Sequence, residues 1–92
     1  MIRSVRHRGL KRLLQRDDAS GVSAAHRVRI EYFLTLLNGA QTPSDVDLPG
    51  YRLHRLRGEL KGFWSVTVSG NWRIVFRMED GDVYDVNLID YH

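Results

Sequence analysis

The chain has 92 residues with 42% apolar side chains, which predicts a single folded domain over residues 1–92 and argues against disorder. It has no cysteine, which excludes disulfides and thiolate zinc sites, and its formal net charge of +3 favours an acidic partner such as a nucleic acid. The start lacks the apolar stretch of a signal peptide and no run is long enough to cross a bilayer, so we expect a cytoplasmic protein without a membrane partner.

The first half of the chain predicts a short strand and two helices. Residues 2–5 predict the strand, and three leucines at helical spacing among basic residues predict an amphipathic helix after it. Ser23 is a suitable N-cap for a second helix that runs to about Asn38, with Gly39 just past its end. The stripe of this helix that should pack on a sheet is Ile30, Phe33, Leu34 and Leu37. Residues 40–50 contain two prolines and predict a loop.

Beyond residue 50 the apolar period changes from helical to alternating. Four strands are predicted, at residues 51–56, 63–68, 71–78 and 83–91. Residues 79–82, Glu-Asp-Gly-Asp, predict a tight hairpin turn because Asp-Gly tolerates positive φ, and Ser69-Gly70 suggests another. The whole order predicts an α+β fold with a short N-terminal strand and both helices on one face of a mainly antiparallel sheet, which ends in a four-strand meander.

Alternation along the strands predicts one apolar face and one cationic face. The apolar positions expected beneath the helices are Trp64, Val66, Val68, Trp72, Ile74, Phe76 and Met78. The opposite face should carry Arg52, His54, Ser65, Thr67, Asn71, Arg73, Val75 and Arg77. In the last strand, Tyr91 falls on the polar side, whereas Asp90 and His92 share the other parity. The chain end must therefore bend, or pass the sheet edge, if these three residues are to form one site.

The terminal Asp90-Tyr91-His92 places a carboxylate, a phenol and an imidazole in a row. All three groups can transfer or orient protons near neutral pH. In a basic chain, such groups favour chemistry on a polyanion, and RNA is the polyanion that we expect. The candidates for binding RNA outside the acid–base groups are Arg52, Lys61, Asn71 and Arg77.

Five segments carry a resemblance to a known family: residues 51–58 (YRLHRLRG), 62–66 (GFWSV), 71–74 (NWRI), Gly81-Asp82 and the terminal Asp90-Tyr91-His92. With them, the sequence resembles the HigB-type ribosome-dependent mRNA endonuclease toxins, including the GraT-like members, within the RelE superfamily. The likeness runs through essentially the whole chain, and its most specific parts are the Asn-Trp-Arg-Ile strand and the Asp-Tyr-His end.

The resemblance implies a RelE-like fold and a toxin that cuts mRNA in the ribosomal A site, halting translation and growth without a cofactor or metal. The implied partners are the ribosome with its 16S rRNA, mRNA, and a helix-turn-helix antitoxin of the HigA or GraA kind. The toxin–antitoxin complex would bind operator DNA. The implied catalytic positions are His54, Arg57, Arg73, Asp90, Tyr91 and His92. Position 57 departs from the family, where lysine is usual, and arginine grips phosphate but cannot readily act as a base.

RNA can be cut without a metal because its own 2′-hydroxyl can attack the adjacent phosphate. His54 or His92 is the candidate base, with the other imidazole or Tyr91 assisting the leaving 5′-oxygen. Arg73 and Arg57 would hold the phosphate, and Asp90 would orient a neighbouring group. A zinc site built from His54, Asp90 and His92 is disfavoured, because neither cysteine nor helical histidine spacing supports it.

Two other functions stay open. The first is a toxin of the same fold that lacks ribonuclease activity, as in the gyrase-poisoning branch of the superfamily, although the His54 segment would then have no role. The second is a non-catalytic module that binds nucleic acid with the cationic sheet face. Both tryptophans are expected in the core rather than as stacking surfaces, and His7 and His26 are expected to have no catalytic part.

Overall fold

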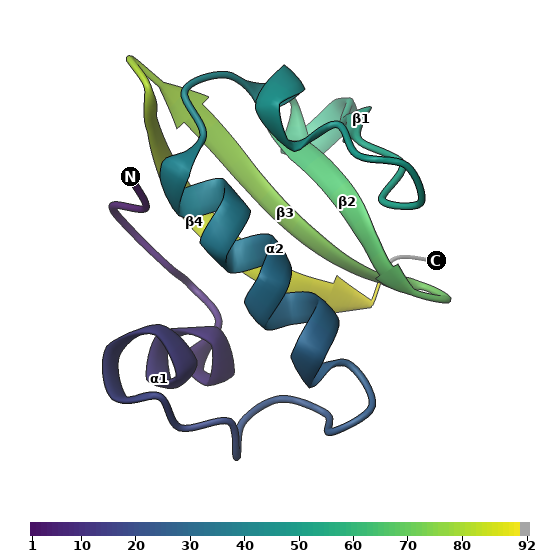
Figure 1. Cartoon of the computed structure of the whole chain (residues 1–92). Coiled ribbons are helices and arrows are strands. Elements are labelled where there is room, and N and C mark those ends of the chain that lie inside the picture. The colour runs from purple at the N-terminus through teal and green to yellow at the C-terminus, as the bar shows by residue number, and fades with distance from the viewer. Residues whose placement is uncertain (91–92) are drawn as a thin grey trace.

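The sheet is a meander of four antiparallel strands in the order β1-β2-β3-β4, in a computed structural model that describes residues 1–90. The strands are β1 (His54–Arg55), β2 (Trp64–Ser69), β3 (Trp72–Glu79) and β4 (Asp82–Asp90). The helices are α1 (Arg8–Arg16) and α2 (Arg27–Gly39), with short 3₁₀ turns η1 (Pro43–Val46) and η2 (Gly58–Leu60). Both α-helices pack into one core against the same sheet face, which confirms the predicted α+β architecture (Figure 1). Within the described range, no helix is both long and apolar enough for a membrane span.

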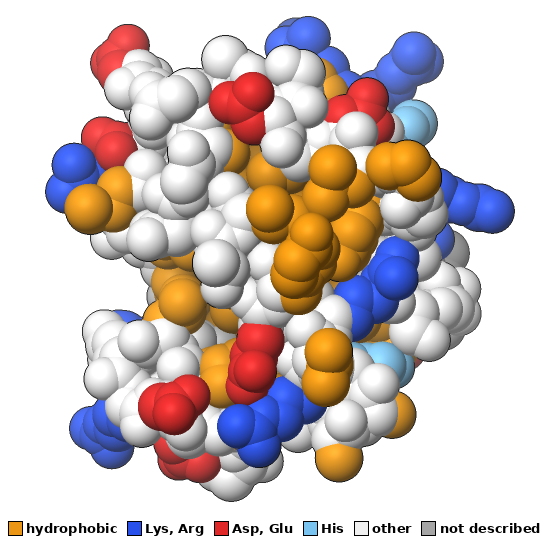
Figure 2. All heavy atoms as spheres, in the orientation of Figure 1, with side chains coloured by type: hydrophobic (Ala, Val, Ile, Leu, Met, Phe, Trp, Pro, Cys, Tyr) orange, Lys and Arg blue, Asp and Glu red, His pale blue; other side chains and the backbone are white. Residues whose placement is uncertain are grey.

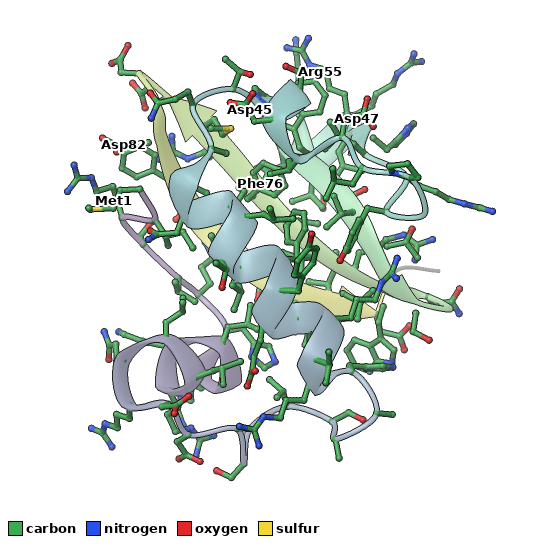
Figure 3. All side chains as sticks on the ribbon, in the orientation of Figure 1. Met1, Asp45, Asp47, Arg55, Phe76 and Asp82 are labelled. Atoms are coloured by element: carbon green, nitrogen blue, oxygen red, sulfur yellow. The ribbon has the colours of Figure 1, made fainter. Side chains whose placement is uncertain are left out.

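The hydrophobic core lies between the two helices and one face of the sheet. Its largest fully buried side chains include Phe33 of α2 and Phe76 of β3, whose ring centroids are 6.1 Å apart. Figure 3 shows Phe76 beside α2. The predicted helix stripe is buried, as expected: Ile30, Phe33, Leu34 and Leu37. Most strand residues predicted beneath the helices also belong to this core or pack against it: Trp64, Val66, Val68, Ile74, Phe76 and Met78.

Trp72 is the exception, and the prediction that it is a core residue is wrong. Its parity matches Ile74 and Phe76, yet it is 39% exposed. Trp72 is the first residue of β3 and pairs with Ser69 next to a register shift in β2. Its indole lies 6.3 Å, between ring centroids, from the imidazole of His26 at the start of α2. Strand parity gives the direction of a side chain but not how far the covering helix extends. Trp72 has the parity of a core residue, but α2 does not cover it fully.

The second helix starts three residues later than predicted, with His26 rather than Ser23 as its N-cap. Ser23 does act as a cap, but of a single turn, because its Oγ accepts a hydrogen bond from the Ala25 N–H at 3.3 Å. The His26 N–H then donates to the Ser23 carbonyl at 3.0 Å, and α2 begins only at Arg27. Gly39 is the last residue of α2 rather than the residue beyond it. Ser23 is therefore a cap, as its residue type predicts, but it caps the single turn before α2 rather than α2 itself.

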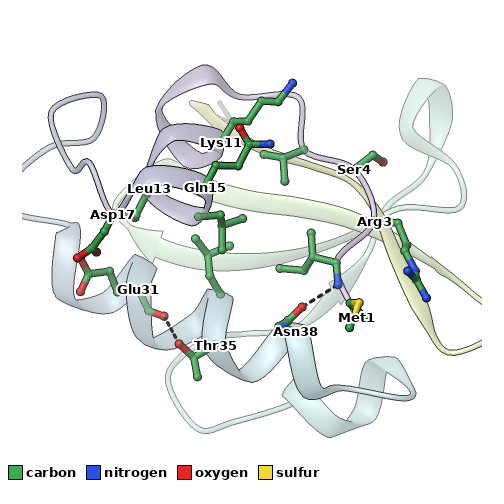
Figure 4. Close-up of a pocket in the computed structure, with 14 residues that line it drawn as sticks. Met1, Arg3, Ser4, Lys11, Leu13, Gln15, Asp17, Glu31, Thr35 and Asn38 are labelled. Atoms are coloured by element: carbon green, nitrogen blue, oxygen red, sulfur yellow. Dashed lines mark hydrogen bonds between the residues drawn. The ribbon is translucent and has the colours of Figure 1, made fainter.

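The predicted N-terminal strand exists as an arm, residues 1–6, that runs parallel to β4. Two isolated bridges connect it, at Ile2–Val83 and Val5–Val86. The arm also carries ion pairs from the terminal ammonium of Met1 and from Arg3 to Asp82, at 3.4 and 3.2 Å. On its other side, the Ile2 N–H donates to Asn38 Oδ1 of α2 at 2.9 Å (Figure 4). The arm therefore protects the outer edge of β4, which is otherwise a free sheet edge.

A β-bulge interrupts the regular alternation predicted for β4. Arg77 pairs with Tyr84, whereas Val75 pairs with Asn87, so β4 contains one extra residue between these pairs. Asp85, at φ 55°, occupies this position in the left-handed region. Its N–H donates to Ser4 Oγ at 2.8 Å, and its carboxylate accepts from Arg77 Nε at 2.8 Å. The bulge therefore joins the arm, β3 and β4 at one residue.

Replacing Asp85 with asparagine should make the protein less sensitive to acid. The hydrogen bond from Arg77, aided by the charge of Arg6, holds the pKa of the Asp85 carboxyl below its ordinary value. A carboxyl with a lowered folded pKa stabilises the fold fully above its unfolded pKa of about 4, and this contribution is lost as the pH falls through the folded pKa. Urea unfolding at pH 7, 5, 4 and 3 measures the effect. The free energy of unfolding of wild type should exceed that of Asp85→Asn at neutral pH, and the difference between them should shrink below pH 4.

The matched control for this comparison is Asp80→Asn in the β3–β4 turn. Asp80 is exposed and has a φ of 51°, close to the 55° of Asp85, so asparagine fits the backbone at position 80 and at position 85 equally well. Asp80→Asn should leave the pH profile of unfolding unchanged. A constant gap between wild type and Asp85→Asn from pH 7 to pH 3 would contradict the proposed stabilising role of the charged carboxylate.

Candidate active-site cleft on the sheet

An open cleft of about 610 Å³ lies against β1, β2 and the start of β3. It is lined by Arg52, Leu53, His54, Leu56, Ser65, Thr67, Asn71 and Arg73. Ser65, Thr67 and Arg73 alternate along their strands with the core residues Val66 and Ile74, so the cleft is on the sheet face opposite the helices. Four residues that the sequence predicted for catalysis or RNA binding meet here: Arg52, His54, Asn71 and Arg73.

His54 reaches the cleft because β1 is short and begins after a sharp turn. The strand predicted over residues 51–56 forms only at His54–Arg55, since Arg52 is in the left-handed region with a φ of 52°. The Tyr51 carbonyl, which accepts from the Thr67 N–H, fixes this turn on β2. His54 pairs with Ser65 and is exposed, so its imidazole is available to solvent and to a ligand.

Arg73 supplies a fixed positive charge at the other side of the cleft. Its Nη1 donates to the carbonyls of Gly70 at 2.6 Å and Trp72 at 3.3 Å. Neither acceptor is charged, so these bonds orient the guanidinium without neutralising it. Arg73 pairs with Thr67 and His54 with Ser65, two residues apart on β2. That register puts their Cα atoms about 12 Å apart, which leaves room for a phosphodiester between two long side chains.

Two of the residues that line the cleft, Ser65 and Leu56, are buried. They are only 4% and 6% exposed, and neither belongs to the core beneath the helices. Val75 and Ser65 pair across β2 and β3. A floor of small and apolar groups under exposed cations lowers the local dielectric, which strengthens the attraction of those cations for an anion. The alternating pattern does not single out Leu53 and Leu56 as cleft residues, and Leu53 also packs against the core beneath the helices.

Asp90 ends β4 at the same end of the sheet as Arg73. It pairs with Trp72, and Ile89 pairs with Arg73. Paired residues point to the same face, so Asp90 shares the face of Trp72 rather than that of Arg73 and does not line the cleft. Figure 1 shows β4 ending beside the β2–β3 hairpin. The other two terminal candidates, Tyr91 and His92, lie outside the described residues.

Three further candidates are not among the residues that line the cleft. Arg57 and Lys61 are exposed at the two ends of η2. Arg77 lies further along β3, where it bonds Asp85 at 2.8 Å and Glu79 at 3.1 Å. Its guanidinium carbon is also 4.7 Å from the ring centroid of Tyr84. Arg77 therefore anchors the bulge, and two carboxylates compete with any phosphate for it.

A second, larger hollow of about 870 Å³ lies between the arm, α1 and α2 (Figure 4). Among the described residues that line it, none is predicted for catalysis or RNA binding. Its lining carries both signs of charge, with the carboxylates Asp17 and Glu31 as well as Arg3 and Lys11, whereas the charged side chains that line the cleft are all basic. The cleft on the sheet is therefore the candidate site for RNA chemistry.

Comparison with known proteins gives consistent matches in sequence and in fold. Residues 3–92 match the profile of a family described as the RelE-like toxin of the type II toxin–antitoxin system HigB. The sequence is 41% identical over 92 residues to the Endoribonuclease HigB of Proteus vulgaris, which covers 100% of both chains. It is 41% identical over 49 residues to the Toxin HigB-1 of Vibrio cholerae serotype O1, covering 52% of each chain. The fold is similar to that of YafQ from E. coli, with a TM-score of 0.65 and 18% identity over 96% of this chain and 89% of YafQ.

Proposed function

Because the chain belongs to the family of RelE-like HigB toxins of type II toxin–antitoxin systems, we propose that it is an endoribonuclease that cuts mRNA in the ribosomal A site. As such a toxin, it has an antitoxin partner. The observation that carries the proposal is the cleft, where the predicted residues Arg52, His54, Asn71 and Arg73 meet on one sheet face. The Proteus relative also supports the proposal, because it is named an endoribonuclease and is 41% identical over the whole length of both chains.

The proposed reaction needs no metal, because the attacking group belongs to the RNA. A neutral imidazole, of His54 or of His92, takes the proton of the 2′-hydroxyl as its oxygen bonds to the phosphorus. Arg73, with Arg52 nearby, balances the negative charge that grows on the phosphate oxygens. The other imidazole or Tyr91 gives a proton to the departing 5′-oxygen. The products are a 2′,3′-cyclic phosphate on the upstream fragment and a 5′-hydroxyl on the downstream fragment.

The C-terminal residues complete this site in our proposal. Asp90 pairs with Trp72, which directly precedes the cleft residue Arg73 in the sequence. The last described residue is therefore at the end of the sheet where Arg73 lies. From there, Tyr91 and His92 would supply the second acid–base group, and Asp90 would orient an imidazole or a guanidinium. Arg57 and Lys61, exposed on η2, would contact the RNA backbone outside the cleft, as would Arg77 if RNA displaced its carboxylate partners.

The proposed setting is the cytoplasm, with the ribosome presenting the mRNA. A cleft that is open and shallow provides few contacts to hold a flexible single strand, so we propose that the ribosome and its 16S rRNA position the substrate. The antitoxin would be a helix-turn-helix protein of the HigA or GraA kind, whose complex with the toxin binds operator DNA. Arg57 stands where the family usually has lysine, and we assign it phosphate binding rather than proton transfer.

Expression in cells with mapping of mRNA 5′ ends tests the proposed function. Wild type should stop growth and produce new 5′ ends within translated regions, and these ends should carry hydroxyl groups. In the arrangement where one imidazole is the base and the other is the acid, His92→Ala should remove most of them, because one proton transfer then lacks its group. Growth arrest without new mRNA ends would instead point to the gyrase-poisoning class, and RNA binding without any cleavage would point to a non-catalytic module.

A further inference from the structure

Trp72 is an exposed aromatic side chain at the end of the sheet where the cleft residues Asn71 and Arg73 lie. Tryptophan is highly buried on average, so an indole that is 39% exposed in a small domain is an informative exception. Because side chains alternate along a strand, the indole is on the face opposite the cleft, at the same end of the sheet. The carbonyl of Trp72 itself accepts a hydrogen bond from the Arg73 guanidinium.

The indole is held in place by its surroundings. Backbone pairing with Ser69 on one side and with Asp90 on the other fixes Trp72 within the sheet. The imidazole of His26 lies 6.3 Å away, between centroids, with the two ring planes tilted by 57°. His26 makes no side-chain cap to α2, so its ring is not engaged in closing the helix. A tilted ring at the edge of the indole supports it without stacking over it, which is compatible with a second flat ligand on the indole face.

The charges at this end of the sheet differ between its two faces. The Arg73 guanidinium lies on the cleft side, whereas the Asp90 carboxylate, next to the proposed catalytic residues Tyr91 and His92, is on the face of Trp72. An RNA strand whose phosphate lies at Arg73 can reach Trp72 around this end of the sheet, where β2 turns into β3 and β4 ends. By contrast, the exposed Val28 and Tyr32 belong to α2, which carries none of the predicted catalytic residues. Figure 2 shows apolar side chains at the surface on this helix side of the molecule.

We propose that Trp72, supported by His26, stacks on an unpaired base of the RNA substrate next to the cleavage site. The inference rests on the proposed function, because it assigns a further contact to the same reaction. Aromatic side chains commonly hold single-stranded RNA in this way, since every base offers a flat face. Trp72 is thus a positioning residue: it fixes the base, and thereby the neighbouring phosphate, without taking part in proton transfer.

Cleavage of short mRNAs on programmed ribosomes tests this assignment. Trp72→Leu should lower kcat/KM about 5- to 100-fold, the range expected for the loss of one stacked base. Trp72→Phe, which keeps an aromatic face, should recover most of the activity. Tyr32→Leu, which removes another exposed aromatic residue outside the cleft, is the matched control and should cleave as wild type does.

A set of mRNAs with one abasic nucleotide at each position around the cut identifies the base. At a single position, the abasic mRNA should slow wild type to the rate of Trp72→Leu, and the two proteins should then be equal. The main signal of this experiment is the rate of wild type on the abasic mRNAs, so a folding defect in the variant cannot hide the result. Equal rates of Trp72→Leu and wild type on the intact mRNA would overturn the inference, as would a deficit of the variant that persists on every abasic mRNA. Failure of wild type to cut any mRNA would instead refute the proposed function.

Discussion

Replacement of His54 by alanine should slow mRNA cleavage on programmed ribosomes by about 10²–10⁴-fold, the contribution of a well-placed general acid or base. His54 is exposed, pairs with Ser65 on the cleft side of the sheet, and is the one imidazole among the residues that line the cleft within residues 1–90. Because its side chain is exposed, the same substitution should change the free energy of unfolding by less than about 0.5 kcal/mol. Single-turnover cleavage and urea unfolding measure the two effects.

The neighbouring Arg55 supplies the control. Arg55 is the other residue of β1 and is also exposed, but its guanidinium lies 5.5 Å from the ring centroid of Trp64, which packs against the core on the helix side. Arg55→Ala should therefore leave the cleavage rate within a few-fold of wild type. Equal rates for wild type and His54→Ala, or equal losses for His54→Ala and Arg55→Ala, would contradict the assignment of proton transfer to the cleft.

Replacement of Phe76 by alanine should have the largest effect on stability. Phe76 is fully buried at the centre of β3 and lies against Phe33 of α2, so the substitution removes contacts between the two layers and leaves a cavity. Changes of this kind lower the free energy of unfolding by about 3–5 kcal/mol, from a total of about 5–15 kcal/mol for a small domain. In a chain of this size, the loss should lower Tm by more than about 12 °C, as measured by calorimetry or circular dichroism.

Val28→Ala is the control for Phe76. Val28 is 80% exposed on α2, and its truncation should change the free energy of unfolding by no more than about 0.5 kcal/mol. Phe76→Leu, which keeps part of the apolar volume, should fall between wild type and Phe76→Ala. A loss below about 1 kcal/mol in Phe76→Ala would show that helices and sheet are not joined through this residue.

The elements that could be predicted from the sequence are those determined by local chemistry. The Asp80-Gly81 turn has positive φ at both residues, as Asp-Gly in a tight hairpin requires. The helix stripe at 3.6-residue spacing is buried along α2. The start of α2 was misplaced because Ser23 can cap a single turn as well as a helix. The bulge at Asp85 could not be predicted, since it depends on Ser4 and Arg77, which are distant in sequence.

The candidate site was predictable where strand parity determined it. His54, Asn71 and Arg73 were placed on one face by alternation, and the structure brings them together in the cleft. Arg57 and Lys61 could not be placed, because nothing in the sequence indicated the 3₁₀ turn η2 that follows Arg57 and precedes Lys61. Parity also placed Arg77 on the cleft face, but its ion pairs with Asp85 and Glu79 depend on the bulge and a cross-strand neighbour.

The most direct test of the active-site assignment is a structure of this protein on a ribosome that holds an mRNA with a 2′-deoxy sugar at the cut, which prevents cleavage. The account predicts that the scissile phosphate lies in the cleft, within hydrogen-bonding distance of the Arg73 guanidinium, with an imidazole of His54 or His92 next to the blocked 2′ position. An mRNA bound on the helix side of the sheet, with the cleft empty, would contradict it.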